Sequence, residues 1–375
     1  MKATISLSII VRNESKVILT MLNSVYTLLD YYVIVDTGST DNTKDIIKKF
    51  FDEKGIPGEI VDHTWKNYGD ARNIAIEVTK DKADYNFWID ADDELIIDSN
   101  FNVDIFKQQL LNYDALDCQY FNTTYEYKKI SFFLSKKPWK WFGALHEVLI
   151  CNENVNVGIA NGLKIIQHSN GYSWSNPNKW QDYYDMINDF MSTIDENDPL
   201  YSRWLFYFAQ TCAESEKFDK AIEYYEKRIK FDTISNNEEV YISLFKLAQI
   251  KAYLGYFNDA INIYLQCHEE NPNRLEHIAQ IIQYYNSIEQ YEIAYIYSSY
   301  AMKFAGKLPN NSYVLLDHSV YLWKIYDLHN ISCWWTGRIE EAKETFKLLW
   351  KQVENGLVDE NEIERITYNK QFNLD

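Results

Sequence analysis

The first hundred residues alternate short apolar runs with amphipathic stretches, and this alternation allows few folds. The apolar runs have the length of strands and occupy residues 5–11, 31–35, 58–61 and 85–89. The stretches between them have helical periodicity and occupy residues 16–29, 40–51 and 70–78. Strands and helices that alternate at this spacing predict an α/β domain with a mainly parallel sheet. Ligands of such sheets bind at the carboxyl ends of the strands.

The chain changes character at about Asp195, after which strand-like runs give way to Tyr-, Leu- and Ile-rich segments with helical period. Within these segments a small residue recurs three positions after a larger apolar one, at Ala221, Ala260, Ala294 and Ala342. Small residues let paired helices approach closely, and the 34-residue step from Ala260 to Ala294 is the tetratricopeptide period. We therefore predict two domains, an α/β domain over 1–195 and a stack of helical hairpins over 196–375. An ordinary helical bundle is the alternative for the second.

Charge and cysteine content exclude several classes of protein. The chain carries 37 Lys and Arg against 55 Asp and Glu, a formal net charge of −18. Nucleic-acid binding needs clustered cations, so we expect no nucleic-acid partner. The five cysteines form no CxxC pair, and no apolar stretch is long enough to span a membrane. These features predict reduced thiols, no membrane span and a cytoplasmic location.

An acidic segment follows the fourth apolar run. Alternate residues of an extended chain project to one side, so Asp90 and Asp92 are predicted to share a cation. Carboxylate oxygens at a strand end suit Mg²⁺ or Mn²⁺ together with substrate phosphates. A calcium loop is disfavoured, because the sixth position from Asp90 is Leu95, where such loops need Gly. A solvated acidic loop is the alternative interpretation.

A second polar cluster, DTGS from Asp36, follows the second apolar run. The same string occurs in aspartic proteases, but those enzymes need two aspartates that share a proton, and this chain has one such motif. At a strand end, Asp36 is predicted to accept hydrogen bonds from a base or ribose. Arg12 and Arg72 are isolated cations near predicted element ends, where an anionic ligand would need them. A capped turn and structural ion pairs are the alternatives.

Residues 136–149 combine aromatic and polar side chains. Trp141 and its aromatic neighbours are predicted to stack on a sugar ring, as aromatic faces do in sugar sites. His146 and Glu147 follow as candidate catalytic residues, with Glu147 as the general base. His168 is a candidate third metal ligand. Each histidine alone is equally consistent with a structural role.

The ordered strings ISLSIIVRNE, VIVDTGSTDNT, GDARN, WIDADDEL and KWFGALHEVL resemble the family 2 glycosyltransferases. These enzymes have the GT-A fold, with a Rossmann-like mixed sheet, and the chain resembles the subgroup that carries tetratricopeptide-like helices after it. The resemblance implies an inverting glycosyltransferase that moves a sugar from a nucleotide-diphosphate sugar. By analogy the donor is a UDP-sugar, and the acceptor is a hydroxyl or other nucleophile of a glycan, peptide or protein.

The resemblance also assigns roles to individual residues. Asp36 and Arg72 contact the nucleoside or diphosphate. Arg12 and Trp141 are candidate donor contacts from the charge and stacking arguments above, not from the resemblance. Asp90 and Asp92 form the DxD motif that holds Mn²⁺ or Mg²⁺. The chain departs from the family at the base, because no ED-type motif lies between residues 98 and 139, and Glu147 is our substitute.

Two other functions are alternatives to this one. A nucleotidyltransferase would need a Gly-rich phosphate loop near residue 10, and VRNESK has no glycine. A catalytically degenerate domain attached to a protein-binding helical scaffold remains open. In either case the helical domain is expected to hold a protein partner or to mediate self-association.

Overall fold

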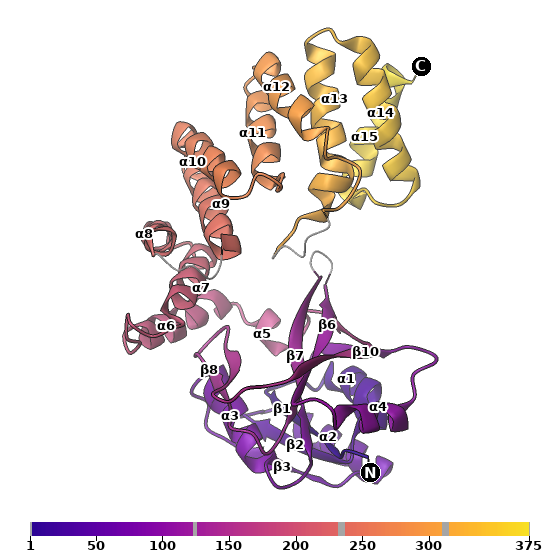
Figure 1. Ribbon diagram of the computed structural model, residues 1–375, viewed down its shortest axis with the longest axis vertical. Helices are drawn as coiled ribbons and strands as arrows, with labels where there is room; N and C mark the ends of the chain where they lie inside the picture. Colours follow the sequence, from indigo (N-terminus) through magenta and orange to yellow (C-terminus); the bar gives the residue numbers. More distant parts are fainter. Residues whose placement is uncertain (1, 123–125, 232–236, 310–314, 375) are drawn as a thin grey trace. The chain divides into compact units, whose positions relative to one another are not determined.

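The computed structural model describes residues 2–122, 126–231, 237–309 and 315–374. The chain divides into two compact units, Met1–Asp195 and Glu196–Asp375, which Figure 1 shows in indigo to magenta and in magenta to yellow. The first unit is α/β and the second is helical in its described part, so the predicted fold class is confirmed. Within the described residues, no helix combines the length and the hydropathy that crossing a bilayer requires.

A mixed eight-stranded sheet forms the centre of the N-terminal unit. In spatial order its strands are β3 (Gly58–Asp62), β2 (Tyr31–Asp36), β1 (Ile5–Val11), β4 (Tyr85–Phe87), β7 (Glu126–Leu134), β6 (Ala115–Phe121), β10 (Val157–Gln167) and β5 (Asp93–Ile97). The first four strands are parallel. Strand β7 is antiparallel to both neighbours, and β10 is parallel to β6 but antiparallel to β5. The expectation of a mainly parallel sheet therefore holds only for β1 to β4, since β5, also within the first hundred residues, pairs antiparallel with β10 at the opposite edge.

Helices and one additional hairpin surround this sheet. The hairpin pairs β8 (Trp139–Phe142) with β9 (Val148–Cys151). The helical segments are α1 (Ile18–Val25), η1 (Tyr26–Leu28), α2 (Thr43–Lys54), α3 (Tyr68–Thr79), α4 (Val103–Leu110), α5 (Tyr172–Ser175) and α6 (Lys179–Met191). Helix α1 buries Ile18, Met21, Leu22 and Val25, which share one face at a spacing of three and four residues.

The C-terminal unit is a series of helical hairpins, visible as successive helix pairs in Figure 1. The pairs are α7 (Tyr201–Glu214) with α8 (Phe218–Lys230), α9 (Asn237–Tyr253) with α10 (Phe257–Glu270), α11 (Glu276–Ser287) with α12 (Tyr291–Ala301), and α13 (Ile325–Trp335) with α14 (Ile339–Glu354). A π-helical segment, η2 (Val320–Lys324), precedes α13, and α15 (Glu360–Asn373) follows α14.

The recurring alanine of the sequence is the fourth residue of the second helix in every pair. Ala221, Ala260, Ala294 and Ala342 are all buried. The turn before each of these helices also repeats, with a left-handed residue two positions upstream, at Glu216, Gly255, Glu289 and Gly337. In each turn the next residue donates its N–H to a carbonyl five residues back, as in a Schellman motif. One turn geometry used four times confirms the predicted hairpin repeat.

Candidate functional site

Asp36 ends β2 and is 1 % exposed. Its Oδ1 atom accepts hydrogen bonds from the backbone N–H groups of Gly38 (2.9 Å) and Ser39 (2.7 Å), which folds the chain into an Asx turn. Gly38 has a φ of 107°, a conformation that side chains disfavour. The other oxygen of Asp36, Oδ2, is buried and has no hydrogen-bond partner among the described residues. A buried carboxylate oxygen without a partner is costly and is suited to a ligand N–H or O–H.

The loop after β1 is tied to the loop after β2. Asn13 donates its backbone N–H to Ser39 Oγ (2.9 Å), and its side-chain oxygen accepts from the backbone N–H of Thr40 (2.7 Å). Arg12 is exposed beside this loop, with its guanidinium carbon 5.9 Å from the centroid of the Tyr172 ring. The two strand ends thus form one edge, with Asp36 buried and Arg12 open to solvent.

The acidic segment is a turn, which corrects the extended geometry that we predicted. Strand β4 ends at Phe87, and Asp93 donates its backbone N–H to the carbonyl of Asp90 (3.1 Å). Asp90 and Asp92 therefore have different partners. Asp90 accepts from Arg72, whereas Oδ2 of Asp92 accepts the backbone N–H of Gly171 at 2.9 Å.

Several carboxylates lie close together at this turn, and their mutual repulsion shifts their pKa values. Burial and repulsion from Asp90 raise the pKa of Asp92. Burial, with repulsion from Asp90 and Asp92, raises the pKa of Asp93 to about 9. The Asp93 side chain also has a buried oxygen, Oδ2, without a partner in the described part of the chain. Asp90 is the exception, since Arg72 and Lys129 outweigh its burial and lower its pKa. A bound cation would relieve this repulsion.

Arg72 connects the acidic turn to Glu147. It projects from α3, is buried, and donates to Oδ1 of Asp90 (2.6 Å) and Oε1 of Glu147 (2.7 Å). Its guanidinium carbon lies 4.6 Å from the ring centroid of Trp88 and 5.1 Å from that of Trp141. Trp141 is itself 3 % exposed, so its ring supports Arg72 instead of forming an open stacking surface.

Helix α3 holds Arg72 through contacts on both sides. Asn67 caps the helix by accepting the backbone N–H of Asp70 (2.8 Å). Asn73 exchanges two hydrogen bonds with the backbone of Trp141 in β8, at 2.8 and 2.9 Å. Gly69 packs so closely on the same hairpin that a Cβ there would lie 2.2 Å from the carbonyl oxygen of Gly143. The GDARN string is therefore a close-packing motif as well as the source of Arg72.

Two charged residues of this site were missed by the sequence analysis. Lys129, on β7, has its ammonium 4.2 Å from the centroid of the Trp88 ring. Its burial lowers its pKa, while Asp90 and Glu147 oppose that shift. Burial raises the pKa of Glu14, in the loop after β1, to about 7, although the hydrogen bond from the backbone N–H of Tyr172 opposes this shift. Two features of the sequence could have pointed to these residues. Lys129 directly precedes an apolar strand segment, and Glu14 ends the polar string RNE that follows the first strand.

Of the remaining predicted residues, His168 forms a hydrogen bond between its Nε2 and Oε2 of Glu94 at 3.0 Å. His146 has a left-handed φ of 55° immediately before Glu147. Neither position tests the roles assigned to these residues, which stay predictions. Asp90 and Asp92 fit a metal-binding role, because they belong to a crowded carboxylate cluster that has a buried, unpaired oxygen nearby.

Replacing Gly171 with Ala tests the contact that positions Asp92. A Cβ at this position would lie 2.9 Å from Oδ2 and 3.0 Å from Cγ of Asp92. We expect Gly171→Ala to displace the Asp92 carboxylate and to weaken metal-dependent nucleotide binding about tenfold, since a misplaced binding group costs roughly that much or more. Titration calorimetry measures the change. Ser99→Ala, at an exposed position of the same unit, is the control, and equal binding by Gly171→Ala and the wild type would contradict the expectation.

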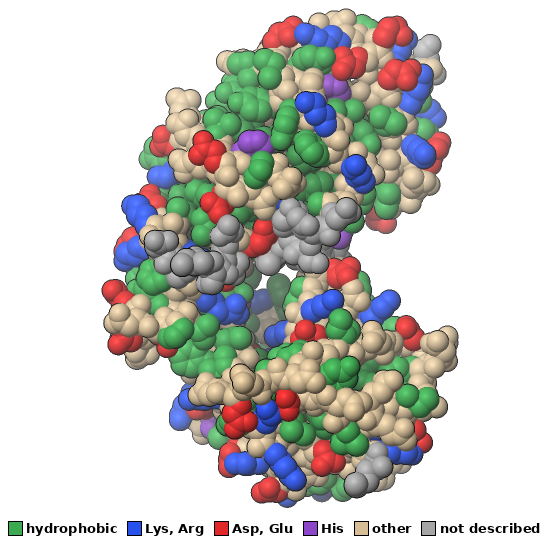
Figure 2. Space-filling view, in the orientation of Figure 1, with side chains coloured by type: hydrophobic (Ala, Val, Ile, Leu, Met, Phe, Trp, Pro, Cys, Tyr) green, Lys and Arg blue, Asp and Glu red, His purple; other side chains and the backbone are tan. Residues whose placement is uncertain are grey.

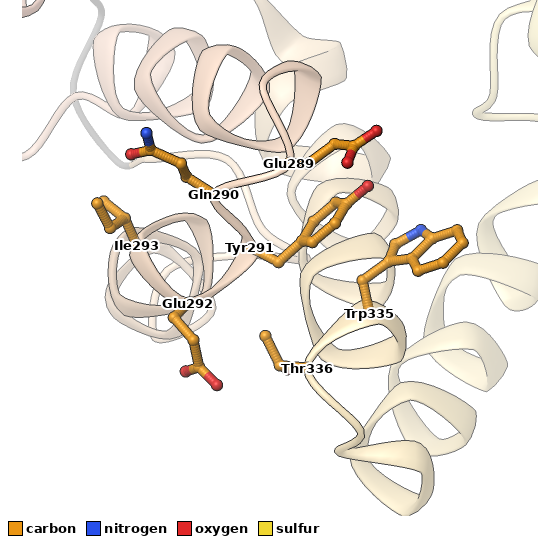
Figure 3. A pocket seen from close by; sticks show the side chains of 7 residues that line it. All are labelled: Glu289, Gln290, Tyr291, Glu292, Ile293, Trp335 and Thr336. Carbon is orange, nitrogen blue, oxygen red and sulfur yellow. The ribbon is translucent and has the colours of Figure 1, made fainter.

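One pocket of the protein contains none of the residues of this candidate site. It lies in the C-terminal unit and is lined by Glu289, Gln290, Tyr291, Glu292, Ile293, Trp335 and Thr336 (Figure 3). Tyr291 and Trp335 stack there at a centroid distance of 5.5 Å. On the face shown in Figure 2, basic side chains lie interspersed with acidic ones over both units.

Comparison with known proteins relates the segment that builds this edge of the sheet to a known family. The model of the family described as glycosyl transferase family 2 matches residues 6–99, which include Asp36, Arg72, Asp90 and Asp92. The resemblance to family 2 glycosyltransferases is therefore confirmed for the segment that builds the site. The N-terminal unit has the mixed, GT-A-like sheet that the resemblance implied.

Individual proteins are similar over longer stretches. The SPbeta prophage-derived glycosyltransferase SunS of Bacillus subtilis (strain 168) is 31 % identical over 237 residues, 60 % of this chain and 53 % of SunS. The chain thus spans about half the length of this relative. Among solved structures, S. aureus TarS 1–349 aligns at 12 % identity with a TM-score of 0.33, covering 82 % of this chain and 94 % of TarS 1–349. A tetratricopeptide repeat protein from Parabacteroides merdae ATCC 43184 aligns at 16 % identity with a TM-score of 0.37, covering 49 % of this chain and 64 % of that one.

Proposed function

We propose that this protein is a metal-dependent, inverting glycosyltransferase that uses a nucleotide-diphosphate sugar, with UDP as the nucleotide. The observation that carries the proposal is the acidic turn, where Asp90, Asp92 and Asp93 crowd together inside the segment that matches family 2. Such crowding raises the free energy of the unliganded protein, and it is retained where charge is needed for binding.

The nucleoside is proposed to bind at Asp36. Its buried Oδ2 needs a donor, and a pyrimidine imide N–H supplies one at the strand edge where α/β sheets bind nucleotides. Arg12 lies exposed near the same edge, where a ligand with negative charge gains from it in a protein of charge −18.

The diphosphate is proposed to lie beside the acidic turn, with Asp90 and Asp92 holding Mn²⁺ or Mg²⁺. When bound, such an ion stabilises negative charge that develops on the leaving diphosphate. Arg72 and Lys129 add two fixed cations at the same turn, both backed by the Trp88 ring. These side chains orient the leaving group and do not need to move during transfer.

Glu147 is the proposed general base, next to His146. Arg72 holds one of its oxygens at 2.7 Å and so orients the carboxylate. The other oxygen would take the proton of the acceptor as the acceptor attacks the anomeric carbon opposite the diphosphate. The acceptor is proposed to be a nucleophile of a glycan, peptide or protein, with the helical hairpins as the surface that holds a protein partner or a second copy.

Thermal stability against nucleotide sugars tests the function. We expect the unfolding midpoint to rise by several degrees only when Mn²⁺ and one of the UDP-, GDP- or dTDP-sugars are present together, because a ligand of the folded state stabilises it by mass action. A midpoint that none of these pairs moves would contradict the proposal and favour the scaffold function. Measuring transfer of a labelled sugar from the pair that binds then identifies the acceptor class.

A further inference from the structure

Three ligand-type side chains meet in the last full hairpin of the C-terminal unit. His329 and Cys333 lie one turn apart on α13, and Glu341 lies in the first turn of α14. Their ligand atoms are all within 4.8 Å of one another. Over residues 2–122, 126–231, 237–309 and 315–374, this is the one group of three His, Cys, Asp or Glu side chains that meets so closely. His329 and Cys333 are buried, whereas Glu341 reaches solvent.

The spacing of these atoms suits a tetrahedral zinc ion. His329 Nε2 is 3.4 Å from Cys333 Sγ and 3.2 Å from Glu341 Oε1. With Zn–S near 2.3 Å and Zn–N and Zn–O near 2.0 Å, a tetrahedron has edges of about 3.5 Å (S to N) and about 3.3 Å (N to O). The two distances from Nε2 therefore match two edges of such a tetrahedron, and the third, between the ligand atoms of Cys333 and Glu341, is within 4.8 Å.

The hydrogen bonds around His329 are compatible with Nε2 as a metal ligand. Ser298 Oγ lies 2.8 Å from Nδ1 of His329 and 3.2 Å from the carbonyl oxygen of Tyr295. When the Ser298 hydroxyl donates to Tyr295, the N–H at Nδ1 donates to Ser298, and Nε2 presents its lone pair toward Cys333 and Glu341. Without an ion, the other tautomer satisfies the same distances, with Ser298 donating to Nδ1 and the N–H at Nε2 donating to Glu341. A hydrogen bond to the far nitrogen accompanies histidines that bind metals.

The carboxylate is oriented as well. Tyr295 donates its hydroxyl to Oε2 of Glu341 at 3.0 Å, so that Oε1 faces His329. Helices α12, α13 and α14, which carry these groups, pack in succession (Figure 1). The ligands and the groups that orient them thus come from two consecutive hairpins.

We propose that His329, Cys333 and Glu341 bind one Zn²⁺ ion, with water as the fourth ligand. Cys333 binds as the thiolate, and its proton passes to solvent. The thiolate and the carboxylate together neutralise the ion, while the thiolate and imidazole favour Zn²⁺ over Mg²⁺ or Mn²⁺. Because α13 and α14 both supply ligands, the ion links the two helices and stabilises only the folded unit.

Zinc binding by the full chain tests this site. After chelation and dialysis against ZnCl₂, we expect about one Zn²⁺ per chain and a midpoint about 5 °C higher than in the chelated protein, by mass action. Glu341→Gln should lose both effects, and because that side chain is exposed the variant should fold. Glu340→Gln, an exposed neighbour, is the matched control and should keep both.

Cobalt identifies the thiolate ligand. Co²⁺ in the wild-type site should show sulfur-to-cobalt charge-transfer absorption, which Cys333→Ser removes and Cys212→Ser retains, since Cys212 is a buried cysteine of the same unit. No bound zinc, or binding unchanged in Glu341→Gln and Cys333→Ser, would overturn the proposal. Zinc lost instead in Asp92→Asn would place it at the acidic turn and would also overturn it. None of these readouts depends on glycosyl transfer.

Discussion

Replacing Asp92 with Asn should make the protein more stable while it removes metal-dependent donor binding. Asn keeps an oxygen that can accept the N–H of Gly171, so the loop stays in place. It removes one negative charge from a cluster in which Asp92 raises the pKa of Asp93 and of Glu14. We expect the free energy of unfolding to rise by on the order of 1 kcal/mol, about one pKa unit of relieved repulsion. Transfer should fall at least about 100-fold, as when other transition-state charge contacts are removed.

The gain in stability should depend on pH with a defined sign. The pKa is raised in the folded state for Asp92, for Asp93 to about 9 and for Glu14 to about 7. Unfolded carboxyl groups titrate near 4, so between about pH 4 and 9 these three carboxyl groups bind more protons in the folded protein than in the unfolded chain. Their contribution to the stability of the wild-type protein therefore falls as pH rises through this window, whereas the lowered pKa values of His277 and His329 act in the opposite sense below about pH 6.5. Asp92→Asn should lose less, and its advantage should be larger at pH 8 than at pH 5.

Urea denaturation at pH 5 and pH 8, together with nucleotide titration in Mn²⁺, measures both effects. Asp98→Asn, an exposed acidic residue shortly after the same turn, is the control and should change neither quantity. A less stable Asp92→Asn protein would show that charge repulsion does not dominate at the turn. Retained Mn²⁺-dependent binding would remove Asp92 from the metal site.

Local periodicity was enough to predict much of the fold. Strands β1, β2 and β3 and the helices between them follow from apolar runs and amphipathic stretches, which are properties of neighbouring residues. Periodicity alone did not predict the mixed half of the sheet, which only the resemblance implied, because β7 pairs with both β4 and β6, and β10 lies between β6 and β5. Those pairings join segments far apart in sequence, and strand pattern alone does not rank them. The hairpin repeat was predictable because Ala294 and its counterparts each follow a larger apolar residue by three positions, a local pattern that persists although the steps between them are uneven.

The candidate site shows the same division between local and distant information. Asp36, Asp90 and Arg72 were recognisable because each lies in a short polar string at an element end. The direction of each side chain was not, since a tight turn at Asp93 separates the partners of Asp90 and Asp92. Lys129 was missed because its role depends on the pairing of β7 with β4, which brings it near Trp88.

Replacing Arg72 with Met should destabilise the protein by about 3 kcal/mol at pH 7, because one variant leaves two carboxylates without their cation. The side chain of Glu147 is only 8 % exposed, so it bears most of this cost, while Asp90 at 36 % gains solvation. Arg72 lowers the pKa of Asp90 in the folded state, so the part of this contribution that comes from Asp90 is present above the unfolded pKa near 4 and is lost as pH falls. Denaturation at pH 7 and pH 4 should therefore show the deficit shrinking in acid, and a deficit independent of pH would contradict the charge argument.

Glu147→Gln separates the two roles that this contact allows. The amide oxygen can still accept from Arg72 Nε, but it cannot take a proton from an acceptor. If Glu147 is the base, donor-induced stabilisation by Mn²⁺ and nucleotide sugar is retained while turnover falls at least about 100-fold. If Glu147 only holds Arg72, donor binding falls as well.

The double variant Arg72→Met with Glu147→Gln should be more stable than Arg72→Met alone, since the second change removes the buried charge that the first one exposes. A double variant no more stable than the single one would place the cost at Asp90 instead of Glu147.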